Sequence, residues 1–217
     1  MDEVGTVVLI FAFLGACDFA IQRVLGAASR WPALHAIGNA VVCLFAAPGV
    51  VATLADPLRC MDARVYPPSH RAAAGGAMCA ITAIHVYHVA FFALTSADRF
   101  HHALFVPVIC FFGHYMQWGA LRQFLAFFIC GLPGMLDYIA VCVYYAGWIT
   151  KPERRHITAI LNIWIRAPGL IFEASMHYVA FAHGTTTVPR AINASIAALV
   201  AWNAMYYAAS SVRSSVR

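Results

Sequence analysis

The chain has 217 residues, of which 62% are hydrophobic and only 11% are charged, and its net charge is +5. Ordinary soluble domains contain about 25% charged residues, so this composition excludes a water-soluble globular domain and indicates a protein that crosses a membrane several times. The positive charges are spread along the chain without a basic stripe or interleaved aromatic residues. We therefore expect no nucleic-acid partner.

The apolar runs predict the helices in chain order. The first run begins almost at Met1 behind two acidic residues and is longer than the apolar core of a signal peptide, so we interpret it as a span. A spanning helix needs about 20 mainly apolar residues. By this measure the sequence predicts spans at 5–25, 33–55, 72–94, 101–118, 122–148, 157–182 and 190–209. The whole chain, 1–217, is thus expected to be one all-α transmembrane domain of about seven helices.

Turn residues and charges separate these runs. Between the fourth and fifth there is only "QWGALR" (117–122), which predicts a tight antiparallel hairpin. Prolines 48, 107, 133 and 168 lie inside spans, and we expect kinks at some of them. More Lys and Arg residues fall on the side of the odd loops and the tail than on the other side, which favours a cytoplasmic C-terminus.

Titratable side chains inside the spans are the candidate functional residues. Each costs a few kcal/mol to insert, so they are expected to face the bundle interior. His102 precedes the predicted turn at Ala120 by about as many residues as Asp137 follows it, which puts both about 25 Å from the turn. We therefore expect imidazole and carboxylate to meet at one depth, and we assign His101, His102 and Asp137 as candidate catalytic residues.

Further polar side chains fall in the same half of the membrane and are candidate substrate-binding residues: His35, His85, His88 and Arg166. His85 and His88 share one helical face. Two simpler interpretations remain open, namely that His35 is an interfacial anchor and that Arg166 is a structural counter-charge. Trp31 and Tyr207 are interpreted as residues of the interfacial aromatic belt.

Several segments carry a family resemblance: "SRWPALHA" (29–36), "AIHVYHVAFF" (83–92), "DRFHH" (98–102), "GLPGMLDY" (131–138), "NIWIRAPGLIF" (162–172) and "WNAMYY" (202–207). Their order resembles the TLC-domain family, which includes ceramide synthases, translocation-associated membrane proteins and small lipid-homeostasis proteins. The resemblance covers about 29–210. It implies a TLC-like helical bundle, a role in membrane lipid metabolism, and residence in the endoplasmic reticulum or another endomembrane.

The chain departs from the ceramide synthase pattern at two places. Those enzymes have His-His-x-x-Thr, whereas Phe105 stands here at the position of the threonine, and their later acidic stretch is reduced to Asp137. The departures argue against acyl-CoA-dependent ceramide synthesis, and the smaller lipid-homeostasis relatives look closer.

Three functional hypotheses follow. The leading one is a lipid-handling protein that binds an acyl lipid in a His/Asp pocket and transfers an acyl group, with acyl-CoA as candidate co-substrate and membrane lipids as partners. The alternative is a non-enzymatic lipid sensor or a membrane assembly or chaperone protein. A histidine-ligated metal or haem oxidoreductase is disfavoured, because the histidine pairs lack the repeated spacing of a two-iron site, so no metal is predicted. Small residues such as Gly75 and Gly76 permit packing against a second copy, so a homo-oligomer stays open.

Overall fold

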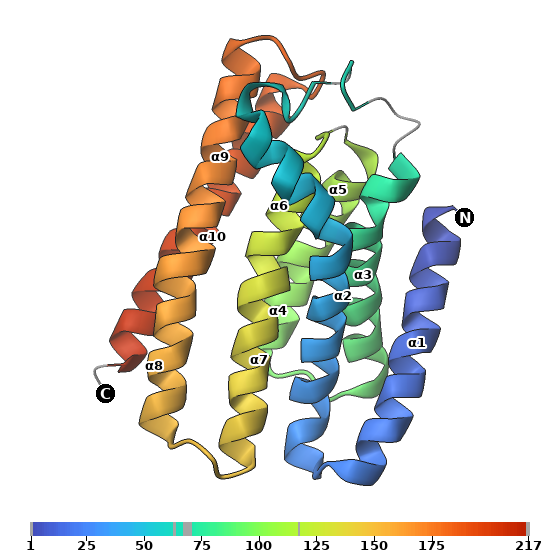
Figure 1. Ribbon diagram of the computed structural model, residues 1–217, viewed down its shortest axis with the longest axis vertical. Helices are drawn as coiled ribbons and strands as arrows, with labels where there is room; N and C mark the ends of the chain where they lie inside the picture. The colour runs from blue at the N-terminus through green and yellow to red at the C-terminus, as the bar shows by residue number, and fades with distance from the viewer. Residues whose placement is uncertain (1, 63, 67–70, 117, 216–217) are drawn as a thin grey trace.

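A computed structural model describes residues 2–62, 64–66, 71–116 and 118–215. The expected domain bounds at residues 1 and 217, and residues 67–70 of the second predicted loop, lie outside this part of the chain. Within it the chain is helical and contains no strand, and the long helices run roughly along the long axis of the molecule (Figure 1). This confirms the all-α class.

The elements follow one another as α1 (Glu3–Val24), α2 (Ala27–Ala55), a 3-10 turn η1 (Pro57–Arg59), α3 (Arg71–Phe91), α4 (Ser96–Phe105), η3 (Val106–Cys110), α5 (Phe111–Tyr115), α6 (Leu121–Ala126), η4 (Phe127–Gly131), α7 (Leu132–Tyr145), α8 (Lys151–Leu161), η5 (Asn162–Arg166), α9 (Ala167–Ala182) and α10 (Arg190–Ser215). The segments η3, η4 and η5 are π-helical and join their neighbours without a break. Three continuous helical rods result, at 96–115, 121–145 and 151–182.

Four helices are long and apolar enough to cross a membrane: Glu3–Val24, Ala27–Ala55, Leu121–Tyr145 and Lys151–Ala182. They correspond to the first, second, fifth and sixth predicted spans and confirm a helical membrane protein. The other three predicted spans are helical as well, at α3, at 96–115 and at α10. The count of seven spans stays a prediction.

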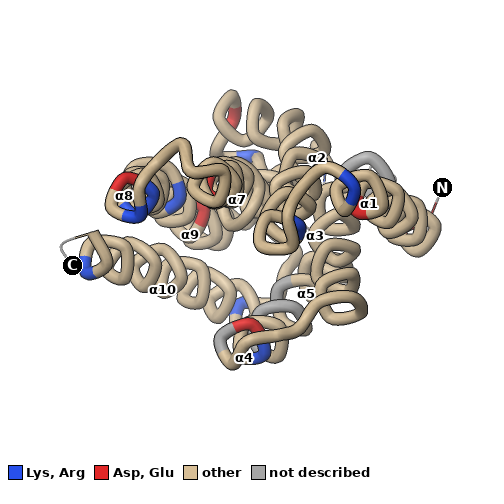
Figure 2. Tube along the Cα trace, turned by 90° about the horizontal axis from the view of Figure 1, so that it is seen from below, with Lys and Arg blue, Asp and Glu red and all other residues tan. Residues whose placement is uncertain are grey.

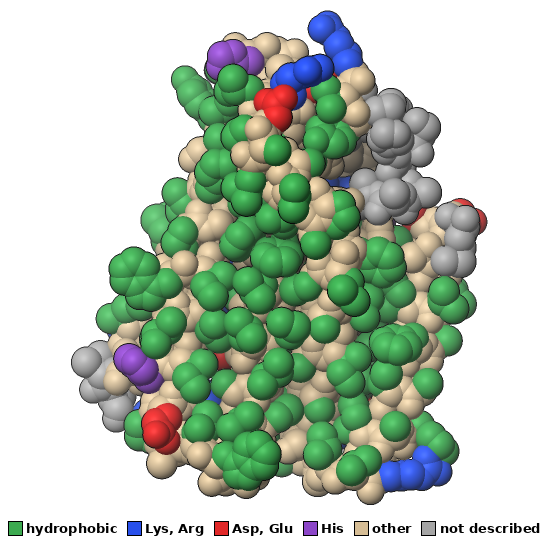
Figure 3. Space-filling view, viewed as in Figure 1, with side chains coloured by type: hydrophobic (Ala, Val, Ile, Leu, Met, Phe, Trp, Pro, Cys, Tyr) green, Lys and Arg blue, Asp and Glu red, His purple; other side chains and the backbone are tan. Residues whose placement is uncertain are grey.

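The outer surface is apolar. The face in Figure 3 is covered with hydrophobic side chains over most of its height, while the coloured charges gather toward its upper and lower ends. Leu44 is 77% exposed and Trp164 is 73% exposed. Exposed apolar surface costs about 25 cal/mol per Å² in water, so an apolar exterior over most of the height of the molecule indicates that lipid surrounds it.

The centre of the bundle is α2, which packs against α1, α3, α6 and α7. Close approach is possible because small residues stand at the crossings. A Cβ on Gly38 would lie 2.6 Å from the Ile84 side chain, and one on Gly76 would lie 2.6 Å from the Phe45 ring. Small residues are what allow membrane helices to pack tightly when no hydrophobic effect drives them together.

Proline accompanies all three π segments and explains two of them. Pro133 and Pro168 each stand two residues after a π segment ends, and Pro107 lies inside η3. Proline has no N–H, so the carbonyls four residues before Pro133 and Pro168 lose their α-helical donor, and a five-residue turn replaces the regular one there. The expected irregularities at these three prolines thus take the form of π segments. Pro48, by contrast, lies within an unbroken α2.

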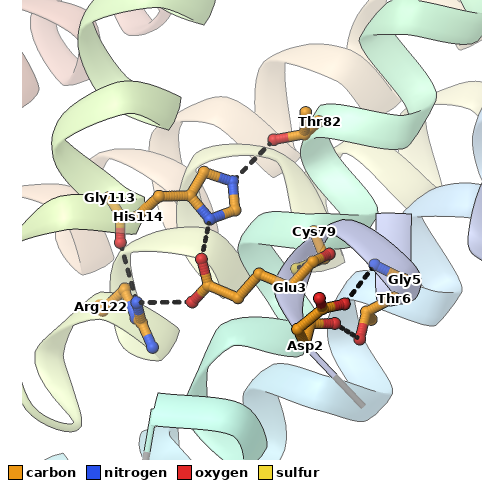
Figure 4. A network of polar contacts seen from close by, with 9 residues as sticks. All are labelled: Asp2, Glu3, Gly5, Thr6, Cys79, Thr82, Gly113, His114 and Arg122. Atoms are coloured by element: carbon orange, nitrogen blue, oxygen red, sulfur yellow. Dashed lines mark hydrogen bonds and ion pairs between the residues drawn. The ribbon is translucent and has the colours of Figure 1, made fainter. Parts of the chain in front are cut away.

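Two polar clusters tie the helices together. In the first, Asp18 on α1 accepts two hydrogen bonds from the Arg30 guanidinium, at 2.7 and 2.6 Å, and a third at 2.9 Å from the Tyr87 hydroxyl on α3. In the second, the Glu3 carboxylate lies 2.9 Å from His114 Nδ1 and 3.9 Å from Arg122 Nη1 (Figure 4). Together they fix both ends of α1 to the rest of the bundle.

The deepest polar pair of the sixth predicted span also forms. His177 Nε2 lies 2.8 Å from Glu173 Oε1, as the four-residue spacing suggests, and Asn193 of α10 bonds to the other ring nitrogen. Both Glu173 and His177 are fully buried. This contact joins α9 to α10.

Candidate functional site

A polar cavity lies between two sides of the bundle. Seen along the bundle in Figure 2, α2, α3 and α7 lie on one side and α4, α5 and α10 on the other. The cavity, which we call the inner chamber, has a volume of about 200 Å³ and receives residues from both sides and from η5. Its polar lining is His35, Asn39, His85, His101, Asp137, Tyr138, Arg166, Asn203 and Tyr207.

A second cavity, which we call the end chamber, adjoins the first toward the helix ends. It has a volume of about 190 Å³ and shares several lining residues with the inner chamber, including His35, His85 and His101. It adds Trp31, Ile84, His88, Asp98 and His102. All seven side chains that the sequence singles out therefore line one chamber or the other.

The imidazoles of α3 and α4 pair across the helix boundary. His85 Nε2 lies 3.2 Å from His101 Nε2, and His88 Nδ1 lies 3.1 Å from His102 Nε2. His85 Nδ1 is 2.7 Å from the Ile81 carbonyl oxygen, which can only accept, so this nitrogen carries a proton. In neutral His85 the Nε2 atom is then the acceptor in the contact with His101.

Aromatic rings form part of the chamber walls. The Trp31 ring stacks on His88 with centroids 3.9 Å apart, and the Tyr138 ring stacks on His35 at 4.0 Å. Tyr207 lines both chambers. Trp31 and Tyr207, which we interpreted as interfacial belt residues, thus contact the polar interior, and His35 is held by ring stacking as well as by its place on the helix.

The predicted contact between His102 and Asp137 does not form among the described residues. Asp137 Oδ1 accepts a hydrogen bond from the Thr158 hydroxyl of α8 at 2.5 Å, and His102 faces His88 in the end chamber. Counting residues from the turn predicts the height of a residue along the bundle. It does not predict the direction in which its side chain points from the helix. The π segments η3 and η4 lie between the turn and these two residues and change that direction. His101, instead of His102, shares the inner chamber with Asp137.

Three buried polar atoms of the inner chamber have no hydrogen-bond partner within the described chain: Asn39 Oδ1, Arg166 Nε and Asn203 Oδ1. Asn39 is 1% exposed and Asn203 is 3% exposed. The Arg166 guanidinium lies 4.8 Å from the centre of the Tyr207 ring. A buried polar atom without a partner costs about 1–3 kcal/mol, so groups of this kind are suited to a ligand or to water.

Sequence reasoning missed the uncharged members of the site. Asn39 follows His35 by one helical turn, and its Nδ2 atom lies 3.0 Å from His35 Nδ1. Asn203 and Tyr207 are spaced by the same turn on α10. This four-residue spacing of polar side chains within an apolar helix is the signal that could have identified them.

The chemistry available to the chambers is that of imidazole, carboxylate, guanidinium and amide groups. Among the described residues, no group of three or more His, Cys, Asp or Glu side chains is arranged to hold a metal ion. Imidazoles can accept and donate protons. A guanidinium beside amide oxygens can bind a ligand group that combines oxygen acceptors with hydroxyl or amine donors.

Comparison of the chain with models of protein families, with curated proteins and with solved structures finds no match in any of the three.

Proposed function

We propose that this protein acts in membrane lipid metabolism or homeostasis and that its inner chamber binds the polar head of an acyl lipid. The observation that carries the proposal is the inner chamber itself, a polar cavity with unpartnered buried atoms inside a bundle whose exterior is apolar. A ligand that matches such a protein has an apolar part that is soluble in the membrane and a polar head that replaces lost hydrogen bonds.

The proposal includes the finer features that the sequence suggests. These are a TLC-like bundle of about seven spans, with the C-terminus in the cytoplasm and the protein in the endoplasmic reticulum or another endomembrane. The order of the tryptophan, histidine, aspartate and arginine signals along 29–210 supports this assignment. Membrane lipids are the expected partners.

An acyl-transfer reaction is the enzymatic form of this function. His101 accepts the proton of a hydroxyl or amine group of the acceptor lipid. The oxygen or nitrogen of that group attacks the carbonyl of an acyl-CoA. The carbon–sulfur bond breaks, and the thiol of coenzyme A leaves with the proton that His101 returns. In this reaction Arg166 holds the acyl oxygen, and proton transfer of this kind contributes about 10²–10⁴-fold to a rate.

A specific contact favours the non-enzymatic form, in which the protein senses or holds a lipid without chemistry. The Asp137 carboxylate accepts a hydrogen bond from Thr158, and among the described residues of the two chambers it has no imidazole partner of the kind that an activated base uses. In this form the imidazoles and Arg166 serve recognition alone.

Lipid analysis of the purified full-length chain tests the proposal. We expect an acyl lipid to be retained at about one molecule per chain, and His101→Ala to lower its retention. His156→Ala, which removes an exposed imidazole of α8, is the matched control and should leave retention unchanged.

Incubation with a labelled acyl-CoA and amine or hydroxyl acceptors then separates the two forms. Turnover that His101→Ala abolishes supports the transferase, and stoichiometric retention without turnover supports the sensor. A chain that retains no acyl lipid under either condition contradicts the proposed function.

A further inference from the structure

The unpartnered atoms of the inner chamber define what a ligand head must offer. Asn39 Oδ1 and Asn203 Oδ1 are acceptors, and Arg166 Nε is a donor. A complementary head therefore supplies at least two hydrogen-bond donors and one oxygen acceptor. A phosphocholine head has no donor, an ionised fatty acid has no donor, and a simple fatty ester has only the acceptor.

An apolar groove leads away from the inner chamber. It lies between Val108 and Phe112 on one wall and Ile192, Ile196 and Leu199 of α10 on the other. The α10 wall continues into the chamber, since Asn203, which lines the chamber, follows Leu199 by one helical turn.

The face of α10 that joins groove and chamber changes from apolar to polar along its length. Ile192, Ile196 and Leu199 are followed at helical spacing by Asn203 and Tyr207, so they form one stripe. The stripe is about 22 Å long at 1.5 Å per residue. This length suits one extended acyl chain with its head, and the pattern orients the head toward the histidines.

We infer that the ligand is a single-chain lipid with a hydroxylated head, of the monoacylglycerol class. Its hydroxyl groups donate to Asn39 and Asn203, its ester carbonyl accepts from Arg166, and its acyl chain lies in the groove between α10 and 108–112. The inference rests on the proposed function and adds the chemical class of the lipid and the path of its chain.

Competition between defined lipids tests the inference. The full-length chain in detergent is offered equimolar monooleoylglycerol, methyl oleate and dioleoylphosphatidylcholine, and native mass spectrometry measures which is bound. We expect monooleoylglycerol to be bound about tenfold more than methyl oleate, because two additional hydrogen bonds are made. Equal binding of these two lipids, or preference for the choline lipid, overturns the inference while leaving the proposed function in place.

Variants of the two asparagines locate the recognition. Asn39→Leu and Asn203→Leu should each reduce binding of monooleoylglycerol about threefold without changing that of methyl oleate. The lipid-free Asn203→Leu variant should unfold no more readily than the parent chain, because the leucine removes a buried carbonyl oxygen that has no partner among the described residues. Asn39→Leu also loses the contact of Nδ2 with His35 Nδ1 and should be destabilised by about 1 kcal/mol. Variants that bind the three lipids in the parent ratios overturn the head assignment.

A substitution in the groove tests the path of the chain. Leu199→Trp fills the groove and should reduce binding of both oleoyl esters, whereas Met205→Trp, on the exposed face of the same helix, should not. If Leu199→Trp binds both esters as the parent does, the tail position is wrong. Failure of every acyl lipid to bind the parent chain contradicts the proposed function itself.

Discussion

Two histidines of one helical rod show two different uses of a polar side chain. His114, at the end of 96–115 near α6, has both ring nitrogens engaged: Nδ1 with Glu3 at 2.9 Å and Nε2 with the Thr82 hydroxyl at 3.0 Å (Figure 4). His101, about 20 Å away along the same rod, faces a cavity that it shares with Asp137 and Arg166.

The surroundings of His114 and His101 differ in a way that separates structural from functional polar residues in a membrane bundle. Both ring nitrogens of His114 find partners, one on α1 and one on α3. Glu3 Oε1 makes no hydrogen bond among the described residues but lies 3.9 Å from the Arg122 guanidinium of α6, so the charges of this cluster hold helices together. Beside the cavity that His101 lines, three buried polar atoms have no partner among the described residues. Since an unpartnered polar atom is costly, a chain that keeps several of them beside one cavity gains from something that binds there.

Removing a structural contact should give the largest loss of stability. Asp18→Ala leaves Arg30 without its two hydrogen bonds and should lower the free energy of unfolding by about 2–3 kcal/mol, a value reduced by the partial exposure of Arg30. Unfolding in a detergent titration measures the loss, and the lipid bound per folded molecule should not change.

The control for this variant is Arg59→Ala, which removes an ion pair of 3.7 Å with Asp62 in which the arginine side chain is 55% exposed. It should change stability by about 0.5 kcal/mol or less. Equal losses for the two variants would contradict the structural role assigned to Asp18.

Removing the cation of the cavity should act on binding instead. Arg166→Gln replaces a charged donor whose Nε has no partner in the described chain, so lipid retention should fall about tenfold. Stability of the lipid-free protein should change little, because no hydrogen bond within the described part of the chain uses the Nε atom. Retention at the parent level would remove Arg166 from the site.

A smaller effect is expected at the partly exposed Glu3. Glu3→Gln weakens its contacts with His114 and Arg122 and should lower stability by about 1 kcal/mol, with no effect on lipid retention. A double-mutant cycle with His114→Gln checks the contact, since the combined loss should be smaller than the sum of the single losses. Additive losses would show that the two side chains do not interact.

The smallest effect concerns the wall of the inner chamber. Pro133→Ala supplies an N–H that can donate to the Ile129 carbonyl, so the α register becomes more favourable in η4, and Ile129 and Cys130 shift at the chamber wall. Lipid retention should fall about twofold while stability stays within about 0.5 kcal/mol. Pro48→Ala, in the unbroken helix α2, is the control and should change neither.

Much of the fold could be predicted from the sequence, because apolar length and turn residues decide where a membrane helix begins and ends. Residue 117 of the predicted hairpin lies outside the described residues, but the short connection from α5 to α6 follows from such counting. The gathering of His35, His85, His101, Asp137 and Arg166 around one cavity follows from it too. The predicted contact of His102 with Asp137 was wrong. The direction in which a side chain points around its helix depends here on η3 and η4, and no apolar pattern in the sequence marks a π segment.

The polar amides were missed for a different reason. Asn39 and Asn203 carry no charge, so they do not stand out in a search for titratable groups, although a buried amide also needs partners. Thr158 was missed because its role depends on which helix lies beside Asp137. The structure puts α8 there, and residue depth alone could not have predicted it.

The apolar lengths of the helices also bear on how the bundle assembles. Among the described residues, α3, α4 and α10 are not both as long and as apolar as a candidate span has to be. These three helices carry His85, His101 and Asn203. Helices of this kind enter a bilayer less readily on their own, and they gain from neighbours that cover their polar side chains. Completion of the cavity and insertion of its less apolar walls would then be one event in the biogenesis of the protein.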